Sequence, residues 1–205
     1  MKNLELLLED FESLGEVVLH PLRPITDREF LALCQRYPDC RIETGAEGEV
    51  IILPPANPQT GSRNQELSGQ LWWWGRDKDG RSFDSSSGFF FANGARRSPD
   101  AAWASRERLA GLKNEDAYWH IVPNFLIELR SSSDRLAALR SKMREWVSNG
   151  VDLAWLIIPE TRTVEIYRAG QPEPSVLQNA AEVRGEGAVD GFVLRLDRVW
   201  APLAE

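Results

Sequence analysis

The chain has 205 residues, of which 42% are hydrophobic and 27% are charged, and its formal net charge is −7 at pH 7. This length and apolar content fit one domain with a sizeable core. The acidic balance argues against a protein that coats nucleic acid with its whole surface, because phosphate binding normally requires a basic footprint. We therefore expect a single domain over residues 1–205, with 1–24 as an N-terminal extension and the core at about 41–170.

Two features of the sequence bear on where the protein resides. No run of about 18 apolar residues occurs, so no membrane span is expected. The segment Met1–Glu5 carries acid where a signal peptide carries basic and then continuous apolar residues, which predicts a cytoplasmic protein.

Cys34 and Cys40 have no second cysteine pair and no His nearby, so we expect reduced structural thiols rather than a zinc site or a disulfide framework.

The first half of the chain predicts two helices with a hairpin between them. A capping-box pattern begins the first helix, alternating apolar residues indicate the hairpin, and apolar residues at helical spacing indicate the second helix. In chain order these elements are a helix from Thr26 to about Tyr37, strands at Arg41–Glu43 and Val50–Leu53, and a helix from about Thr60 to Gly75.

The second half predicts three strands, a helix and two further strands. These elements are strands at Phe89–Phe91, Asp100–Ser105 and Pro123–Arg130, a helix capped by Ser133 and Asp134 that ends at Asn149, and strands at Leu153–Ile158 and Thr163–Arg168. The order is helix, three strands, helix, strand, with added hairpins at both ends. It predicts an α/β fold in which helices flank a mixed central sheet.

Two carboxylates on neighbouring strands form the one constellation that suggests chemistry. Alternation along Phe125–Arg130 sends Glu128 and Arg130 to the same face of their strand. Asp100 follows Pro99 at the mouth of another strand, where a carboxylate is well placed to hold an ion. Carboxylate oxygens suit Mg²⁺ or Mn²⁺, so the pattern predicts a divalent-metal site, and an ordinary strand-edge salt bridge is the alternative.

Lys142 must reach these carboxylates if it belongs to the same site. At about 100° per residue, the apolar residues of its helix fall within a stripe about 100° wide, and Lys142 lies roughly 40° beyond one edge of it. Its stem can therefore lie on the core while the ammonium extends along the sheet. The stripe contains Leu136 and, expected to be buried, Leu139, Met143, Trp146 and Val147.

The αβββαβ order, with Pro99-Asp100 on the second strand and Glu128-x-Arg130 on the third, resembles the restriction-endonuclease-like PD-(D/E)XK nuclease superfamily. The stretch from Pro123 to Tyr167 is more closely similar to a widespread bacterial family of predicted endonucleases within it. The resemblance extends from about Thr26 to Val199. It implies an endonuclease that depends on Mg²⁺, or Mn²⁺, and hydrolyses DNA phosphodiester bonds, with a non-catalytic binding or scaffold protein of the same fold as the alternative.

The resemblance also assigns site residues. It carries the metal-binding roles onto Asp100 and Glu128. Arg130 replaces the usual lysine two residues after the Glu, and Lys142 on the following helix matches a lysine that has migrated there. A guanidinium cannot act as a base, although either cation could stabilise charge on a phosphate. An additional acid could correspond to Glu66 or Glu43, and for Glu66 an exposed surface glutamate is the alternative.

Cations and aromatic residues near this pattern suggest partners. We expect Arg96, Arg97 and Arg135 to contact DNA, with weak affinity and no specified sequence, and solvated charges on a surface are the alternative. Trp72–Trp74 and Phe89–Phe91 favour a core or subunit interface over base stacking. A homodimer is expected, because cutting a duplex requires two sites.

Overall fold

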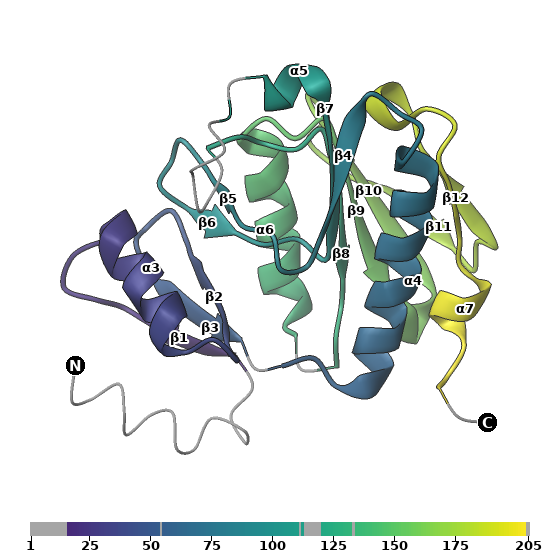
Figure 1. Cartoon of the computed structure of the whole chain (residues 1–205). Helices are drawn as coiled ribbons and strands as arrows, with labels where there is room; N and C mark the ends of the chain where they lie inside the picture. The colour runs from purple at the N-terminus through teal and green to yellow at the C-terminus, as the bar shows by residue number, and fades with distance from the viewer. Residues whose placement is uncertain (1–15, 54, 111, 113–119, 133, 204–205) are drawn as a thin grey trace.

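A six-stranded mixed sheet forms the centre of the computed structural model, which describes residues 16–53, 55–110, 112, 120–132 and 134–203 (Figure 1). Strand β8 pairs in parallel with β9, and the other neighbouring strands pair antiparallel. In spatial order the strands are β11 (Ser175–Gln178), β10 (Thr163–Arg168), β9 (Leu153–Ile158), β8 (Phe125–Leu129), β7 (Ala101–Ser105) and β4 (Gly80–Asp84).

Helices cover both faces of this sheet (Figure 1). Helix α4 (Pro58–Gly75) packs on one face, and α6 (Leu136–Ser148), which connects β8 to β9, packs on the other. Alternation along β8 decides which side chain meets which helix: Ile127 joins the core under α4, whereas Leu126 joins the core under α6. The predicted burial of α6 is confirmed for Met143 and Trp146, which are 0% exposed, whereas Leu139 and Val147 are only partly buried.

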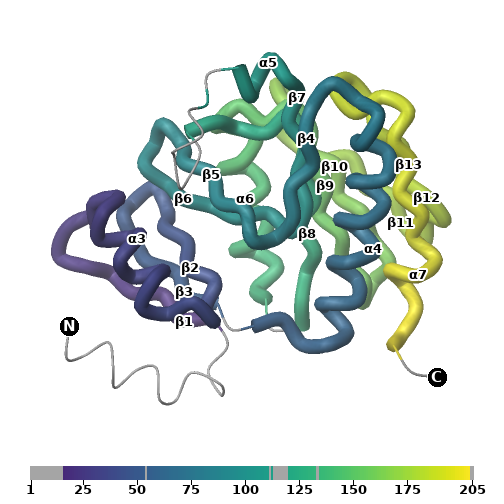
Figure 2. Tube along the Cα trace, viewed as in Figure 1, coloured from purple at the N-terminus to yellow at the C-terminus, as the bar shows by residue number. Residues whose placement is uncertain are grey.

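A smaller sheet and one helix form a lobe beside this body, which we call the N-terminal lobe. The chain enters it first through β1, β2 and β3 and returns through β5 and β6 (Figure 2). The predicted capping box at Thr26 and the predicted hairpin are both confirmed. The lobe consists of β1 (Val17–Leu19), α3 (Asp27–Arg36), β2 (Arg41–Thr44), β3 (Val50–Leu53), β5 (Phe89–Phe90) and β6 (Arg96–Arg97).

The C-terminal segment adds a hairpin and a short helix to the α4 face of the central sheet. Phe192 and Val199 from this segment are buried in the same core as Leu71 of α4. The elements are η2 (Gly187–Val189), α7 (Asp197–Trp200) and the hairpin strands β12 (Glu182–Arg184) and β13 (Val193–Arg195); α5 (Arg106–Leu109) and η1 (Pro159–Thr161) are short turns elsewhere.

The predicted αβββαβ order is present as α4, β4, β7, β8, α6 and β9, but the first strand was placed wrongly. It is β4, in which Phe83 is the one apolar residue among glycine and polar residues, because β4 lies at the sheet edge and needs no continuous apolar face. Phe89 and Phe90 pair instead with β6 in the smaller sheet.

The predicted cap of α6 was also wrong. Arg135 is the N-cap residue, and the Asp134 carboxylate accepts a hydrogen bond from the Ser131 backbone N–H. Ser133 lies outside the described residues, as do residues 1–15 of the predicted extension.

Within the described chain, no helix is both long and apolar enough to cross a membrane.

Candidate metal and nucleic-acid site

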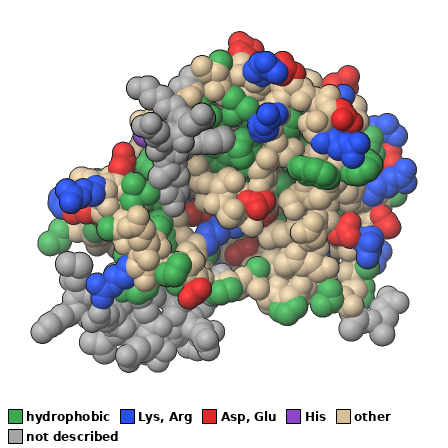
Figure 3. Space-filling model, in the orientation of Figure 1, with side chains coloured by type: hydrophobic (Ala, Val, Ile, Leu, Met, Phe, Trp, Pro, Cys, Tyr) green, Lys and Arg blue, Asp and Glu red, His purple; other side chains and the backbone are tan. Residues whose placement is uncertain are grey.

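Five charged side chains, four of them from β2, β8 and α6, meet in a cleft of about 970 Å³ between the N-terminal lobe and the body. Arg41 and Glu43 come from β2, Asp100 immediately precedes β7, Glu128 lies on β8, and Lys142 lies on α6. Figure 3 shows this face hollowed between the two parts, with acidic and basic atoms inside the hollow. The predicted site residues Asp100, Glu128 and Lys142 therefore share one cavity.

Asp100 is held by three donors. Its Oδ2 accepts a hydrogen bond of 2.7 Å from the backbone N–H of Leu129, which ties it to the strand that carries Glu128. Its Oδ1 accepts bonds from Arg41 Nη1 at 3.1 Å and from Asn64 Nδ2 at 3.3 Å. The carboxylate is buried, so these bonds fix its orientation at the base of the cleft.

Lys142 reaches Glu128, as the helical arithmetic predicted. Its Nζ lies 2.9 Å from Glu128 Oε1 and 3.0 Å from Glu43 Oε1. The indole Nε1 of Trp146, one turn further along α6, donates to the same Glu128 oxygen at 2.9 Å. Helix α6 therefore presents both an ammonium and an indole N–H to one buried carboxylate.

Glu43 is the additional acid that the structure brings to the cleft. Its Oε1 accepts bonds from Arg41, Lys142 and the Ser98 backbone N–H, and Arg97 Nη1 lies 3.4 Å from its Oε2. Burial alone would raise its pKa, but the three cations outweigh burial and lower the pKa to about 2. Glu43 is therefore ionised at neutral pH.

Glu128 responds differently to the same surroundings. Burial is the largest influence and raises its pKa, and the nearby charges of Asp100 and Glu43 act in the same direction. Lys142 and Arg41 oppose this shift without cancelling it. Three acids within one cleft thus compete for the same cations, and Glu128 is compensated less well than Glu43.

Arg41 is the cation that sequence analysis missed. Its Nη1 bonds Asp100, and its Nη2 lies 3.0 Å from Glu43 Oε1 and 4.0 Å from Glu128 Oε2. These carboxylates raise the pKa of Arg41 against the opposing effect of burial. The alternation of Arg41 and Glu43 on one strand was the available signal, because residues two apart share a face.

Asn64, rather than Glu66, is the side chain that α4 contributes. Asn64 lies on the helical stripe of the buried Leu67 and Leu71, and a polar residue on an apolar stripe was the signal that could have found it. Its Oδ1 is buried and has no hydrogen-bond partner among the residues that the structure describes. Glu66 instead pairs at 3.2 Å with Arg198 from α7, away from this cleft.

The other predicted cations lie in different places. Arg130 pairs with Glu160 at 3.2 Å, because the chain has left β8 and the side chain turns toward the segment after β9. Arg96 is buried in the N-terminal lobe, where it bonds Thr44 and Asp27 and packs on Phe30 and Phe90.

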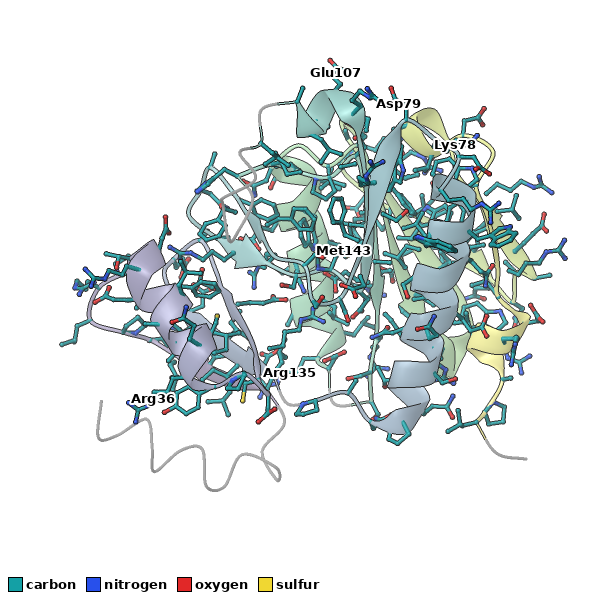
Figure 4. The ribbon with its side chains drawn as sticks, in the orientation of Figure 1. Arg36, Lys78, Asp79, Glu107, Arg135 and Met143 are labelled. Atoms are coloured by element: carbon teal, nitrogen blue, oxygen red, sulfur yellow. The ribbon has the colours of Figure 1, made fainter. Side chains whose placement is uncertain are left out.

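Arg97 and Arg135 both line the cleft, but their surroundings differ. Arg97 is buried, and its guanidinium bonds Glu145 and Glu43. Arg135 is exposed at the N-terminus of α6, close to the N-terminal lobe (Figure 4). Of the three arginines predicted to bind DNA, Arg135 is thus the one whose charge is presented to solvent.

The donor set fits a hard divalent cation. Asp100 and Glu128 supply carboxylate oxygens, and the unpartnered Oδ1 of Asn64 supplies an amide oxygen beside Asp100. Mg²⁺ keeps several of its waters and needs only one or two protein carboxylates. Among the described residues, no three acidic, His or Cys side chains are grouped so that they could hold a metal ion together. Arg41 and Lys142 instead pair with the carboxylates of the cleft.

Comparison with known proteins agrees with this architecture. A solved structure described as "a putative nuclease belonging to DUF820" from Anabaena variabilis superimposes with a TM-score of 0.73, at 22% identity, over 86% of this chain and 98% of that one. No curated protein matches significantly. The family described as "Uma2: Putative restriction endonuclease" matches residues 27–197. The chain therefore belongs to the Uma2 family and has its restriction-endonuclease-like nuclease fold.

Proposed function

We propose that this protein is an endonuclease that hydrolyses DNA phosphodiester bonds with Mg²⁺ or Mn²⁺. The observation that carries the proposal is the position of Lys142, whose ammonium lies 2.9 Å from Glu128 in the cleft that also contains Asp100. Two carboxylates can hold a divalent ion that activates water, and a nearby ammonium can oppose the charge that develops on a phosphate. Membership of the Uma2 family supports the same reaction class.

Each side chain has a distinct role in this proposal. Asp100 and Glu128 hold the ion, with Asn64 Oδ1 as a further oxygen ligand, and the bound ion would polarise the phosphate and lower the pKa of a water. The Leu129 N–H keeps Asp100 oriented toward Glu128. Lys142 Nζ donates hydrogen bonds to the phosphate or the attacking water, where its charge opposes the negative charge that develops.

The DNA partner enters through the open side of the cleft. Arg135 is exposed there and supplies a phosphate contact, whereas Arg96 and Arg97 are already paired within the protein. The net charge of −7 supports weak, salt-sensitive binding. We include a homodimer in the proposal, because cleavage of both strands of a duplex requires two such clefts.

A non-catalytic protein of the same fold has one observation in its favour. The carboxylates of Asp100, Glu43 and Glu128 already have cationic partners in Arg41 and Lys142, so the cluster holds together without a metal. Such a protein could keep the cleft as a structural salt-bridge network. Metal binding therefore separates the two functions.

The test combines plasmid cleavage with calorimetric titration of Mn²⁺. The wild type is expected to nick supercoiled plasmid in Mg²⁺ or Mn²⁺ and to bind Mn²⁺, and both Asp100→Asn and Glu128→Gln are expected to lose both properties. Glu66→Gln is the matched control, because Glu66 lies outside the cleft and pairs with Arg198. A wild type that binds no Mn²⁺ and cuts no DNA would leave the non-catalytic function.

A further inference from the structure

Arg41 contacts both carboxylates of the proposed metal site from the lobe side of the cleft. Its guanidinium lies 3.1 Å from Asp100 Oδ1 and 4.0 Å from Glu128 Oε2 through different nitrogens. It also donates to Glu43 and to the Ser98 carbonyl. A planar guanidinium with several fixed donors can bridge carboxylates in this way.

The other cations of the cleft do not make this bridge in the described structure. Lys142 touches Glu128 and Glu43, and Arg97 touches Glu43 and Glu145. Only Arg41 of these three has a salt bridge to Asp100. Its charge is thus located where an ion shared by Asp100 and Glu128 would neutralise the same two carboxylates.

We propose that Arg41 occupies the cation position between Asp100 and Glu128 in the metal-free protein, and that a divalent cation binds by displacing its guanidinium. This inference rests on the proposed function. A guanidinium stays protonated at all relevant pH values, so Arg41 can leave the carboxylates only by moving. Its side chain is 26% exposed and lines the cleft, so the guanidinium can move into the cleft when a cation binds.

The displaced guanidinium has a natural acceptor in the proposed substrate. A phosphate group in the cleft can accept two parallel hydrogen bonds from Arg41, in place of its separate bonds to Asp100 Oδ1 and Glu43 Oε1. Metal binding frees Arg41 for phosphate, and phosphate draws Arg41 away from the metal ligands. By thermodynamic linkage, the metal and the phosphate backbone then increase each other's affinity.

The first test is Mn²⁺ affinity measured by calorimetry on the full chain without DNA. Arg41→Gln removes the competing charge, and we expect it to bind Mn²⁺ about tenfold more tightly than the wild type. Arg97→Gln is the matched control, because it removes a cation of the same cleft that has no salt bridge to Asp100 or Glu128. Its affinity should stay within about threefold of the wild type. Equal or weaker binding by Arg41→Gln would overturn the inference.

A second measurement, by NMR, uses the wild-type protein and therefore does not depend on whether a variant folds. In ¹⁵N-labelled wild type, the Arg41 Nε–Hε resonance should shift and its proton exchange should accelerate as Mg²⁺ is added, because its bond to Glu43 Oε1 is released. The Arg97 Nε–Hε bond to Glu145 should remain protected. An Arg41 signal that stays protected at saturating Mg²⁺ would contradict displacement.

The two proposals fail in different ways. If the wild type binds Mn²⁺ and loses this binding in Asp100→Asn, but Arg41→Gln binds no more tightly, the metal site stands and the inference about Arg41 is wrong. If neither the wild type nor Arg41→Gln binds Mn²⁺, the metal-dependent function itself is wrong.

Discussion

Glu43 and Glu128 belong to different sheets, yet they share the ammonium of Lys142, which lies 3.0 Å from one carboxylate and 2.9 Å from the other. Lys142 thereby joins the N-terminal lobe to the body. Its side chain is only 11% exposed, so it neutralises two buried charges as well as facing the cleft. Both roles enter the prediction for its replacement.

Lys142→Ala is expected to abolish Mg²⁺- or Mn²⁺-dependent nicking of plasmid DNA and to lower the free energy of unfolding by about 3 kcal/mol, since it leaves buried carboxylates without a partner. Lys142 lies outside the apolar stripe of its helix, but its ammonium is enclosed between two buried carboxylates, and this is why its removal is costly. Plasmid assays and urea unfolding measure the two effects. Arg130→Lys is the comparison and should keep activity, because Arg130 pairs with Glu160. Cleavage by Lys142→Ala at the wild-type rate would show that another cation stabilises the charge that develops on the phosphate.

Trp146 should contribute to stability in two separable ways. Trp146→Ala leaves a large cavity beneath α6 and should cost about 3–5 kcal/mol. Trp146→Phe keeps much of the ring but removes the Nε1 donor of Glu128, and it should cost about 1–3 kcal/mol. Chemical denaturation measures both. A loss below about 1 kcal/mol for Trp146→Ala would show that α6 is peripheral to the core.

Asn64 and Glu66 provide a matched pair on one helix. Asn64→Ala removes both the hydrogen bond to Asp100 and the unpartnered Oδ1, and we expect at least about a tenfold loss in the metal-dependent rate. Glu66→Ala should change that rate by less than about twofold, because Glu66 pairs with Arg198 at the surface. Cleavage rates at saturating Mn²⁺ compare them. The reverse order of effects would return the role to Glu66.

Arg135 should contribute to DNA affinity through charge alone. Arg135→Gln is expected to weaken binding uniformly across sequences and to reduce the slope of log affinity against log salt by about 1. Fluorescence anisotropy over a salt series, with Ca²⁺ in place of Mg²⁺, measures the slope. Arg36→Gln, on the helix of the N-terminal lobe, serves as the control. An unchanged slope would place the DNA elsewhere on the protein.

Glu43 gives the unfolding equilibrium a defined pH dependence. Its pKa of about 2 in the folded protein lies below the ordinary value of 4.5, so its contribution to stability is fully present above pH 4.5 and is lost as the pH falls toward 2. The contribution is about 3 kcal/mol. Urea unfolding at several pH values should show a fall in the wild type that is smaller in Glu43→Gln. Parallel curves would show that the cations do not hold Glu43 ionised.

The sequence by itself determined the features that depend on local periodicity and capping. Alternation placed Glu128 on the same face of β8 as Leu126, and helical angles placed Lys142 beside the buried stripe of Met143 and Trp146. The capping box at Thr26 likewise follows from residues three apart. Such features are predictable because the backbone geometry of one element fixes them.

Only the tertiary structure decided which distant side chains complete the cleft. Arg41 reaches Asp100 and Glu43 reaches Lys142 because β2 pairs with β6, and that pairing positions the N-terminal lobe against the body. The choice of Asn64 over Glu66 depends on which face of α4 meets the sheet, and Arg130 turns away because Glu160 lies within reach. Each outcome depends on long-range packing and charge pairing between elements, because the periodicity within one element shows which residues share a face but not what that face contacts.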